Sequence, residues 1–408
     1  MLNKNDTTVL RSLAQLYAGY AALTVQTEKK RLWEKLNTFS MERPLILFDQ
    51  LPWHELDVDG SLVCQVSDPY WRGVEISLRR DIYKWEHMPA DMVLNPYILL
   101  PRSIAYTGYG IASHVTTAVT DVRSDVVGQS YGCQFTSMED IEKIQTPQAI
   151  VYRDNEAVIA EQADTLFNGI TGWRFGGMTL HLGLWDFITQ WMGVEEVYTC
   201  IYDNPDLLHG IMERLTAGTA LFIEQMNRDG LFDVNVNVCH CSHTFLPTDI
   251  DGREPISQNT WAFGLAQLFT SVSPAVTAEF EVPYMKRLFP YFGNIYYGCC
   301  DRLDDRIDVV LNMPNIRKLS CSPWSNPEVF ASKLPKTCVM SVKPNPALFA
   351  ASLFSAEAVK ADLRKAMSAA KRYGCNLEFI YKDVSTVKYR PQSLWETAKL
   401  AVEVAEDY

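Results

Sequence analysis

The sequence predicts an α/β protein, a closed (β/α)8 TIM barrel with an N-terminal helical extension. Strand and helix patterns alternate through at least five cycles in the second half of the chain, which is typical of a parallel sheet covered by helices. An open doubly wound sheet is the competing architecture, but it usually carries a glycine-rich phosphate loop after its first strand, and none is found. A length of 408 residues suits one such barrel with an extension.

The N-terminal part predicts helices. Apolar residues recur at helical spacing at Leu10, Leu13 and Leu16, and the pattern repeats over 31–36. We expect residues 1–42 to form a helical lid or extension and residues 43–408 to form the barrel. The short apolar run 45–48, closed by an aspartate and a proline, is the first expected strand.

The region 60–160 is less regular, and it is not assigned strand by strand. Its aromatic-rich pieces alternate with polar ones, and a stretch rich in threonine and valine at 114–127 predicts a hairpin outside the regular repeat.

The second half gives a clear succession of elements. Pro205 starts a helix that runs to Gly230, and a strand at 231–238 follows directly. Pro274 opens the next helix. The remaining predicted elements are a strand ending at 299–300, a helix at 303–311, a strand at 316–322, a helix from 325, a strand at 337–342, a helix at 359–373 and a last strand at 377–381.

Two clusters of soft metal-ligand side chains stand where predicted strands end. Cys239-His-Cys-Ser-His follows the strand at 231–238, and Tyr296-Tyr-Gly-Cys-Cys-Asp ends the strand before 300. In an extended chain, successive side chains point to opposite faces. Cys299 and Cys300 therefore share a pocket only if the strand has already become a loop.

Composition excludes several classes of function. The chain has 37 basic and 49 acidic residues, a net charge of −12, which argues against a sequence-independent grip on nucleic acid. No segment reaches the length of a membrane span and the N-terminus lacks the pattern of a signal peptide. We expect a cytoplasmic protein whose ten cysteines are thiols, buried or metal-bound.

The motif Asp-Asn-Pro-Asp-Leu-Leu-His at 203–209, followed by Ser-Pro at 273–274 and Glu-Phe-Glu-Val-Pro-Tyr at 279–284, resembles the uroporphyrinogen decarboxylase superfamily. The resemblance runs from about residue 165 to the C-terminus and depends on the order and spacing of the motifs. It implies a barrel of strands and helices, and either decarboxylation of porphyrinogens or zinc-dependent methyl transfer to and from corrinoid proteins.

The residues at the strand ends distinguish the decarboxylases from the methyltransferases of this superfamily. The arginine-rich signature by which the decarboxylases bind substrate carboxylates is missing, because the strand at 45–48 is followed by Asp-Gln-Leu-Pro-Trp-His. The thiol-methylating branch is expected to have His-x-Cys after a late strand and a cysteine after the last one. This chain has Tyr297-Gly-Cys299 and Lys382-Asp-Val-Ser-Thr there, with Lys-Pro-Asn-Pro at 343–346. This set is similar to substrate-side methyltransferases of the O-demethylase type.

The implied activity is transfer of a methyl group from a small methylated substrate, such as an aromatic methyl ether, to a cobalt(I) corrinoid protein. Zinc would act as the Lewis acid on the ether oxygen, with the corrinoid (cobalamin) carried on a partner protein. The expected partners are that corrinoid protein and the small substrate, and assembly as a homodimer is left open. The alternatives are a decarboxylase acting on a tetrapyrrole and a noncatalytic tetrapyrrole or corrinoid binding protein.

The candidate site residues follow from strand ends, where the ligands of such barrels converge. The metal candidates are Cys299, Cys300, Asp301, Cys241 and His240, against the alternative of plain buried cysteines and local imidazole hydrogen bonds. The catalytic candidates are Lys382, Asp383 and Lys343, against a solvated ion pair. The candidates for substrate binding are Trp261, Phe263, Tyr297, Trp324 and His243, against ordinary core packing.

Two glutamates receive structural interpretations. Glu281 is expected to be a surface or capping residue, because the helices of a barrel face outward. Glu378, inside the last strand, is expected to point into the barrel, where an unpaired carboxylate is costly.

Overall fold

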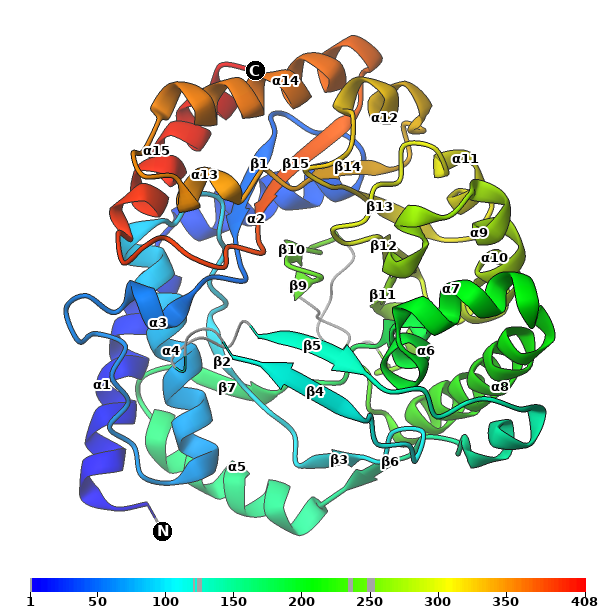
Figure 1. Ribbon diagram of the computed structural model, residues 1–408. Helices are drawn as coiled ribbons and strands as arrows, with labels where there is room; N and C mark the ends of the chain where they lie inside the picture. The colour runs from blue at the N-terminus through cyan, green and yellow to red at the C-terminus, as the bar shows by residue number, and fades with distance from the viewer. Residues whose placement is uncertain (1, 120–121, 123–126, 234–237, 248–253) are drawn as a thin grey trace.

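The strands of the computed structural model lie in a ring surrounded by helices (Figure 1). The structure describes residues 2–119, 122, 127–233, 238–247 and 254–408. Seven parallel strands form the main sheet in the order β1-β15-β14-β13-β12-β11-β8. Their bounds are β1 Leu45–Phe48, β8 His181–Leu182, β11 Trp261–Gly264, β12 Asn294–Tyr297, β13 Ile316–Cys321, β14 Val339–Val342 and β15 Asn376–Tyr381.

The other strands form pairs. The parallel pair is β2 Tyr97–Leu100 with β7 Gly172–Phe175. The antiparallel pairs are β3 Ile104–Tyr106 with β6 Ala149–Val151, β4 Val115–Ala118 with β5 Gly128–Tyr131, and β9 Val238–Cys239 with β10 Ser242–His243.

The first strand lies beside the last, because β1 pairs with β15 along its whole length. The N-terminal and C-terminal strands of the chain are therefore neighbours in the main sheet. Among the described residues, however, no hydrogen-bonded ladder joins β2 and β7 to the seven-stranded sheet. The structure thus confirms a mixed α/β fold with a parallel sheet, whereas the predicted closed ring of eight strands is not shown.

Fifteen α-helices occur in the described part of the chain, and those of the second half alternate with the strands. They are α1 Lys4–Ala21, α2 Val25–Asn37, α3 Trp53–Leu56, α4 Pro69–His87, α5 Arg153–Phe167, α6 Leu184–Met192, α7 Val194–Asp203, α8 Pro205–Asp229, α9 Pro274–Phe280, α10 Val282–Leu288, α11 Ile307–Val310, α12 Pro327–Lys333, α13 Ala347–Ala350, α14 Ala356–Tyr373 and α15 Gln392–Glu406.

Helix α8 shows how the sequence sets these boundaries. Pro205 occupies its first turn, where a missing N–H costs nothing. Gly230 ends it in the left-handed conformation at φ 63°, which a residue without a Cβ adopts without strain. The predicted strand that follows is described only in part, since residues 234–237 lie outside the described residues.

One buried ion pair identifies the inner face of the sheet. Lys318 of β13 and Glu378 of β15 lie 2.6 Å apart with fully buried side chains, although β14 separates their strands. A contact that skips a strand is possible only on the concave side. Because side chains alternate along a strand, the residues at even spacing from these two also face inward.

Helix α2 contacts the amino-terminal part of β13, whereas α1 packs against α4 and α5. The backbone carbonyl of Asn37, at the end of α2, accepts a hydrogen bond from Arg317 Nε at 2.8 Å. Trp33 is fully buried and donates its indole N–H to the Asp91 carbonyl at 2.8 Å. Helix α2 therefore lies at the amino ends of the strands, opposite the end where a mouth is expected.

The hairpin predicted at 114–127 is present as β4 and β5, and its residues 120–121 and 123–126 lie outside the described residues. Among the helices described, none combines the length and the apolar character that crossing a bilayer requires.

Candidate active site

Four polar side chains follow the carboxyl ends of strands in the main sheet. Asp49 follows β1, Lys382 follows β15, Lys343 follows β14 and Cys299 follows β12 after a single glycine. The Asp49 N–H donates to the Tyr381 carbonyl at 2.9 Å, which fixes the first two strand ends side by side. In parallel α/β proteins this edge is where active sites form.

The centre of the cluster is the pair of Cys299 and Lys382. The Lys382 ammonium donates to Cys299 Sγ at 2.9 Å, and Cys300 Sγ lies 3.5 Å from the same sulfur. The hydrogen bond from Cys300 and the charge of Lys382 outweigh burial and lower the pKa of Cys299 to about 7. The pKa of Cys300 is raised by its hydrogen bond to that thiolate and by burial. Cys299 is thus the thiolate of the pair, and both cysteines belong to a loop, as their positions require.

Alkylation of Cys299 should show this directly. Because its pKa lies below the usual thiol value, its rate of reaction with iodoacetamide should reach half its maximum near pH 7. In Lys382→Met the ammonium is lost, so we expect the curve to move to higher pH. Peptide mass spectrometry reads the site, and the exposed Lys286→Ala serves as control. An unchanged curve in Lys382→Met would contradict the pairing.

A second proton-bearing group lies one strand away. Lys343, 2% exposed, donates to the hydroxyls of Tyr296 and Ser341, the latter at 2.8 Å. Tyr296 in turn donates to Ser341 Oγ at 2.6 Å. Burial, followed by the neighbouring charge of Lys382, outweighs the attraction of Glu378 and lowers the pKa of Lys343 to about 8. Such a lysine can release a proton near neutral pH.

The hairpin of β9 and β10 carries His240 and Cys241 into the ring (Figure 1). Both residues form the two-residue turn with positive φ, 46° and 67°, as in a type I′ turn, which normally uses asparagine and glycine. Non-glycine residues in this region cost about 1–3 kcal/mol each and concentrate at functional sites. The strained residues are therefore the two that bring an imidazole, His240, and a thiol, Cys241, to the cluster.

Relieving this strain should stabilise the protein. The double variant His240→Asn, Cys241→Gly should exceed His240→Ala, Cys241→Ala in free energy of unfolding by about 1–3 kcal/mol. Both variants remove the imidazole and the thiol, so their difference reports chiefly the backbone preference of asparagine and glycine for positive φ. Urea unfolding at equilibrium measures it. Equal stability of the two variants would show that the turn is not strained.

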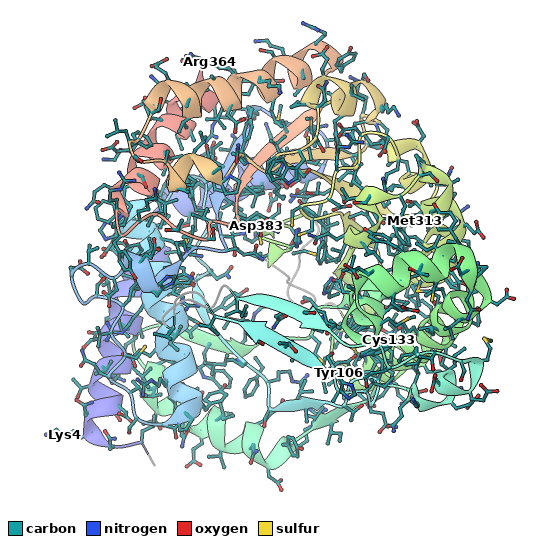
Figure 2. The ribbon with its side chains drawn as sticks, viewed as in Figure 1. Lys4, Tyr106, Cys133, Met313, Arg364 and Asp383 are labelled. Atoms are coloured by element: carbon teal, nitrogen blue, oxygen red, sulfur yellow. The ribbon has the colours of Figure 1, made fainter. Side chains whose placement is uncertain are left out.

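The imidazole of His240 is neutral and faces Lys382. Its Nε2 lies 3.4 Å from the ammonium, and burial together with the charges of Lys343 and Lys382 lowers the pKa of His240. The ring stacks on Phe263 at 3.7 Å between centroids with an interplanar angle of 9°. Lys382 also lies 3.3 Å from Asp383, which Figure 2 labels near the middle of the ring.

A cavity of about 670 Å³ adjoins this cluster. Asp49 and Cys241 line it, together with residues of α4, β2 and the segment after β7. The charges of Lys382 and Lys343 act on Cys241, so both ammonium groups lie within electrostatic range of the cavity wall. This volume accommodates a small molecule.

The predicted metal ligands are Cys299, Cys300, Asp301, Cys241 and His240. In the described part of the chain, no three or more histidine, cysteine, aspartate or glutamate side chains are arranged to hold a metal ion. Asp301 Oδ1 instead accepts the Cys299 N–H at 2.8 Å, and the Lys382 ammonium lies against Cys299 Sγ. The side chains as placed do not fit the zinc ion that the sequence predicts.

The predicted substrate-binding residues separate into two groups. His243 lines the cavity, and its Nε2 accepts the Val93 N–H at 3.0 Å. Phe263 supports His240 from the side, and Trp261 is buried beside Lys318. Tyr297 and Trp324 fall elsewhere. Tyr297 is 1% exposed and faces Glu281 on the helix side, since it alternates with the inward Tyr296, and Trp324 is 70% exposed.

The two glutamates and one lysine show what sequence patterns missed. Glu281 occupies the N-cap position of α10, although its side chain makes no capping hydrogen bond. It is fully buried and not on the surface, and burial raises its pKa well above the usual value. Glu378 does point inward, and it is paired with Lys318. The sequence motifs do not predict a role for Lys318, although a base and an acid inside two apolar strands are a signal for such a pair. They also do not distinguish Tyr296 from Tyr297 in the same motif.

Comparisons with known proteins address the fold. No protein-family model matches the chain, and no curated protein matches it either. Among solved structures, a methyltransferase from Methanosarcina mazei is similar, with a TM-score of 0.52, 10% sequence identity, and coverage of 93% of this chain and 98% of that chain. At this identity the likeness shows that the two chains share a fold over nearly their whole length.

Proposed function

We propose that this chain is a methyltransferase that moves a methyl group from a small methylated compound, such as an aromatic methyl ether, to the cobalt(I) of a corrinoid carried on a separate protein. We also propose that β2 and β7 complete a closed barrel around the site. The pairing of the first strand, β1, with the last strand, β15, supports the closed barrel. The fold shared with a methyltransferase supports methyl transfer.

The observation that carries the proposal is the hydrogen-bonded group of Lys343, Tyr296 and Ser341 at the inner face of the sheet. Cleavage of a methyl ether leaves negative charge on the oxygen, and a positioned proton donor stabilises that charge as it develops. A lysine with a pKa of about 8 is protonated at neutral pH and still acidic enough to donate.

The side chains suggest a relay for the proton. Burial raises the pKa of Tyr296 well above its usual value, so the phenol keeps its proton at rest. When the ether oxygen departs, the Tyr296 hydroxyl turns from Ser341 Oγ to the oxygen, gives it a proton and takes one from the Lys343 ammonium. The site ends with a neutral amine at Lys343, an unchanged phenol and a neutral alcohol or phenol as product.

The second pair positions the substrate. The Cys299 thiolate and the Lys382 ammonium, 2.9 Å apart, place fixed opposite charges beside the cavity without adding net charge. His240, stacked on Phe263, forms a flat wall against which an aromatic ring packs. The docked corrinoid supplies cobalt(I), a strong nucleophile that accepts the methyl group.

The test is a methyl transfer assay under exclusion of oxygen. The chain is mixed with a reduced corrinoid protein and a panel of methyl ethers, and loss of the cobalt(I) absorption is followed. We expect loss that depends on the chain and on one class of ether, retained in the exposed control Lys286→Ala. If methyl iodide consumes cobalt(I) while no ether does so, methyl transfer is the wrong function. Release of carbon dioxide from a carboxylated tetrapyrrole would favour decarboxylation instead.

A further inference from the structure

The Lys382 ammonium lies among three acceptors of different chemistry. Its Nζ is 2.9 Å from Cys299 Sγ, 3.4 Å from His240 Nε2 and 3.3 Å from an Asp383 carboxylate oxygen. The side chain is 1% exposed. An ammonium has three N–H donors and no acceptor, so the number of donors equals the number of acceptors around it.

These acceptors come from three separate parts of the fold. Cys299 follows β12, His240 lies in the turn between β9 and β10, and Asp383 is next to the lysine itself after β15. In both contributing loops the backbone adopts a positive φ at or next to the acceptor residue, 86° at Gly298 and 46° at His240. Such an arrangement is fixed by the fold and is not a chance surface contact.

Thiolate sulfur, imidazole nitrogen and carboxylate oxygen are also the ligand atoms that Zn²⁺ takes in proteins, at about 2.0–2.3 Å. Here they surround a nitrogen at hydrogen-bonding distances. Outside this set, the nearby Asp301 is held by the Cys299 N–H. The Lys382 ammonium therefore occupies the position that a metal ion would need.

We propose that Lys382 replaces a divalent metal as the cation of this site, so that the enzyme binds and transforms its substrate without resident zinc. The ammonium balances the thiolate and donates hydrogen bonds, and stabilisation of the leaving oxygen comes from proton donation. The inference rests on the site described for the proposed function. It does not depend on the reaction, because metal binding is measured without turnover.

The test is a titration with Co²⁺ of the metal-stripped protein, followed by thiolate-to-cobalt charge-transfer absorption, with zinc content measured separately. The wild type should show no such band and far less than one zinc per chain. In Lys382→Cys the ammonium gives way to a third soft ligand, and we expect about one tightly bound metal ion per chain with a strong band. Lys382→Ala should show a weaker band.

The controls are chosen to isolate the position. Lys343→Ala removes another buried strand-end lysine, one that contacts hydroxyls, and should gain no band. Adding Cys299→Ala to Lys382→Cys removes one of the two thiolates and should weaken the band to about that of Lys382→Ala. Circular dichroism checks that each variant is folded, and Lys382→Ala serves if Lys382→Cys is not.

Two results would overturn the inference. One is a wild type that holds about one zinc ion per chain and loses it in Cys299→Ala, since the lysine would then be displaced by metal. The other is the absence of any cobalt band in both folded Lys382 variants, because the three acceptors would then not converge on one centre. Neither result would bear on whether a methyl group is transferred, and failure of transfer would leave the metal result standing.

Discussion

Methyl transfer by Lys343→Ala should fall by a factor of about 10²–10⁴ relative to the wild type, which is the usual contribution of a positioned proton donor. The reason is that Tyr296 has a raised pKa and cannot be reprotonated without the ammonium beside it. The rate of cobalt(I) loss under single-turnover conditions measures the effect. Lys286→Ala, on the outer side of α10, should behave as wild type.

The pH dependence of the methyl transfer rate tests the role of Lys343 independently. Burial lowers the pKa of Lys343 to about 8, so the donor is present below that pH and lost above it. The wild-type rate should therefore fall as pH rises through about 8. The residual rate of Lys343→Ala should lack this limb. If both enzymes show the same limb, another group titrates and Lys343 is not the donor.

Loss of Lys318 should destabilise the fold by about 3–5 kcal/mol, because Lys318→Ala leaves the Glu378 carboxylate buried without its partner. The pair is 2.6 Å apart, and both side chains are fully buried. The double variant Lys318→Met, Glu378→Leu removes both charges and should recover most of the loss, since an apolar pair of similar volume avoids the desolvation cost. Equilibrium unfolding in urea measures each variant.

A surface pair provides the matched control. Lys333 and Asp308 lie 3.0 Å apart, and the Asp308 side chain is 73% exposed. Asp308→Ala should change the free energy of unfolding by about 0–1 kcal/mol. If Lys318→Ala is no more harmful than Asp308→Ala, the inner ion pair does not hold β13 and β15 in register.

The regular elements could be predicted because their signals are local. The first strand was predicted at 45–48 and is β1 Leu45–Phe48, and the helix between Pro205 and Gly230 has the predicted ends. Proline at a helix start and glycine at its end act through their own backbone preferences, independent of the rest of the fold. The alternation of these elements was sufficient to indicate a parallel sheet.

Positions that depend on packing between distant segments were harder to predict. Trp324 is the third residue after β13, yet it is 70% exposed and does not line the cavity. Tyr297 and Tyr296 differ by one residue, and alternation places only Tyr296 inside. A general rule about helices predicts a surface or capping position for Glu281; it is at the N-cap position of α10, but it is fully buried. No local pattern distinguishes these cases.

The cysteine loops illustrate the same limit for chemistry. The sequence correctly required Cys299 and Cys300 to leave the strand before they could act together, and they do so after Gly298, at φ 86°. It identified Lys382, just after the last predicted strand, as a separate catalytic candidate. The lysine lies against the thiol because the ends of β12 and β15 approach each other inside the ring, and no linear pattern contains that distance.

The destination of an isotopically labelled methyl group tests the central claim most directly. A methyl ether with a ¹³C-labelled methyl group is incubated with the chain and a reduced corrinoid protein, and the cobalt-bound methyl group is analysed by mass spectrometry. The account predicts that the label appears on cobalt with wild type and Lys286→Ala, and is nearly absent with Lys343→Ala. If the label stays on the ether in all three, or reaches cobalt equally well without Lys343, the account is contradicted.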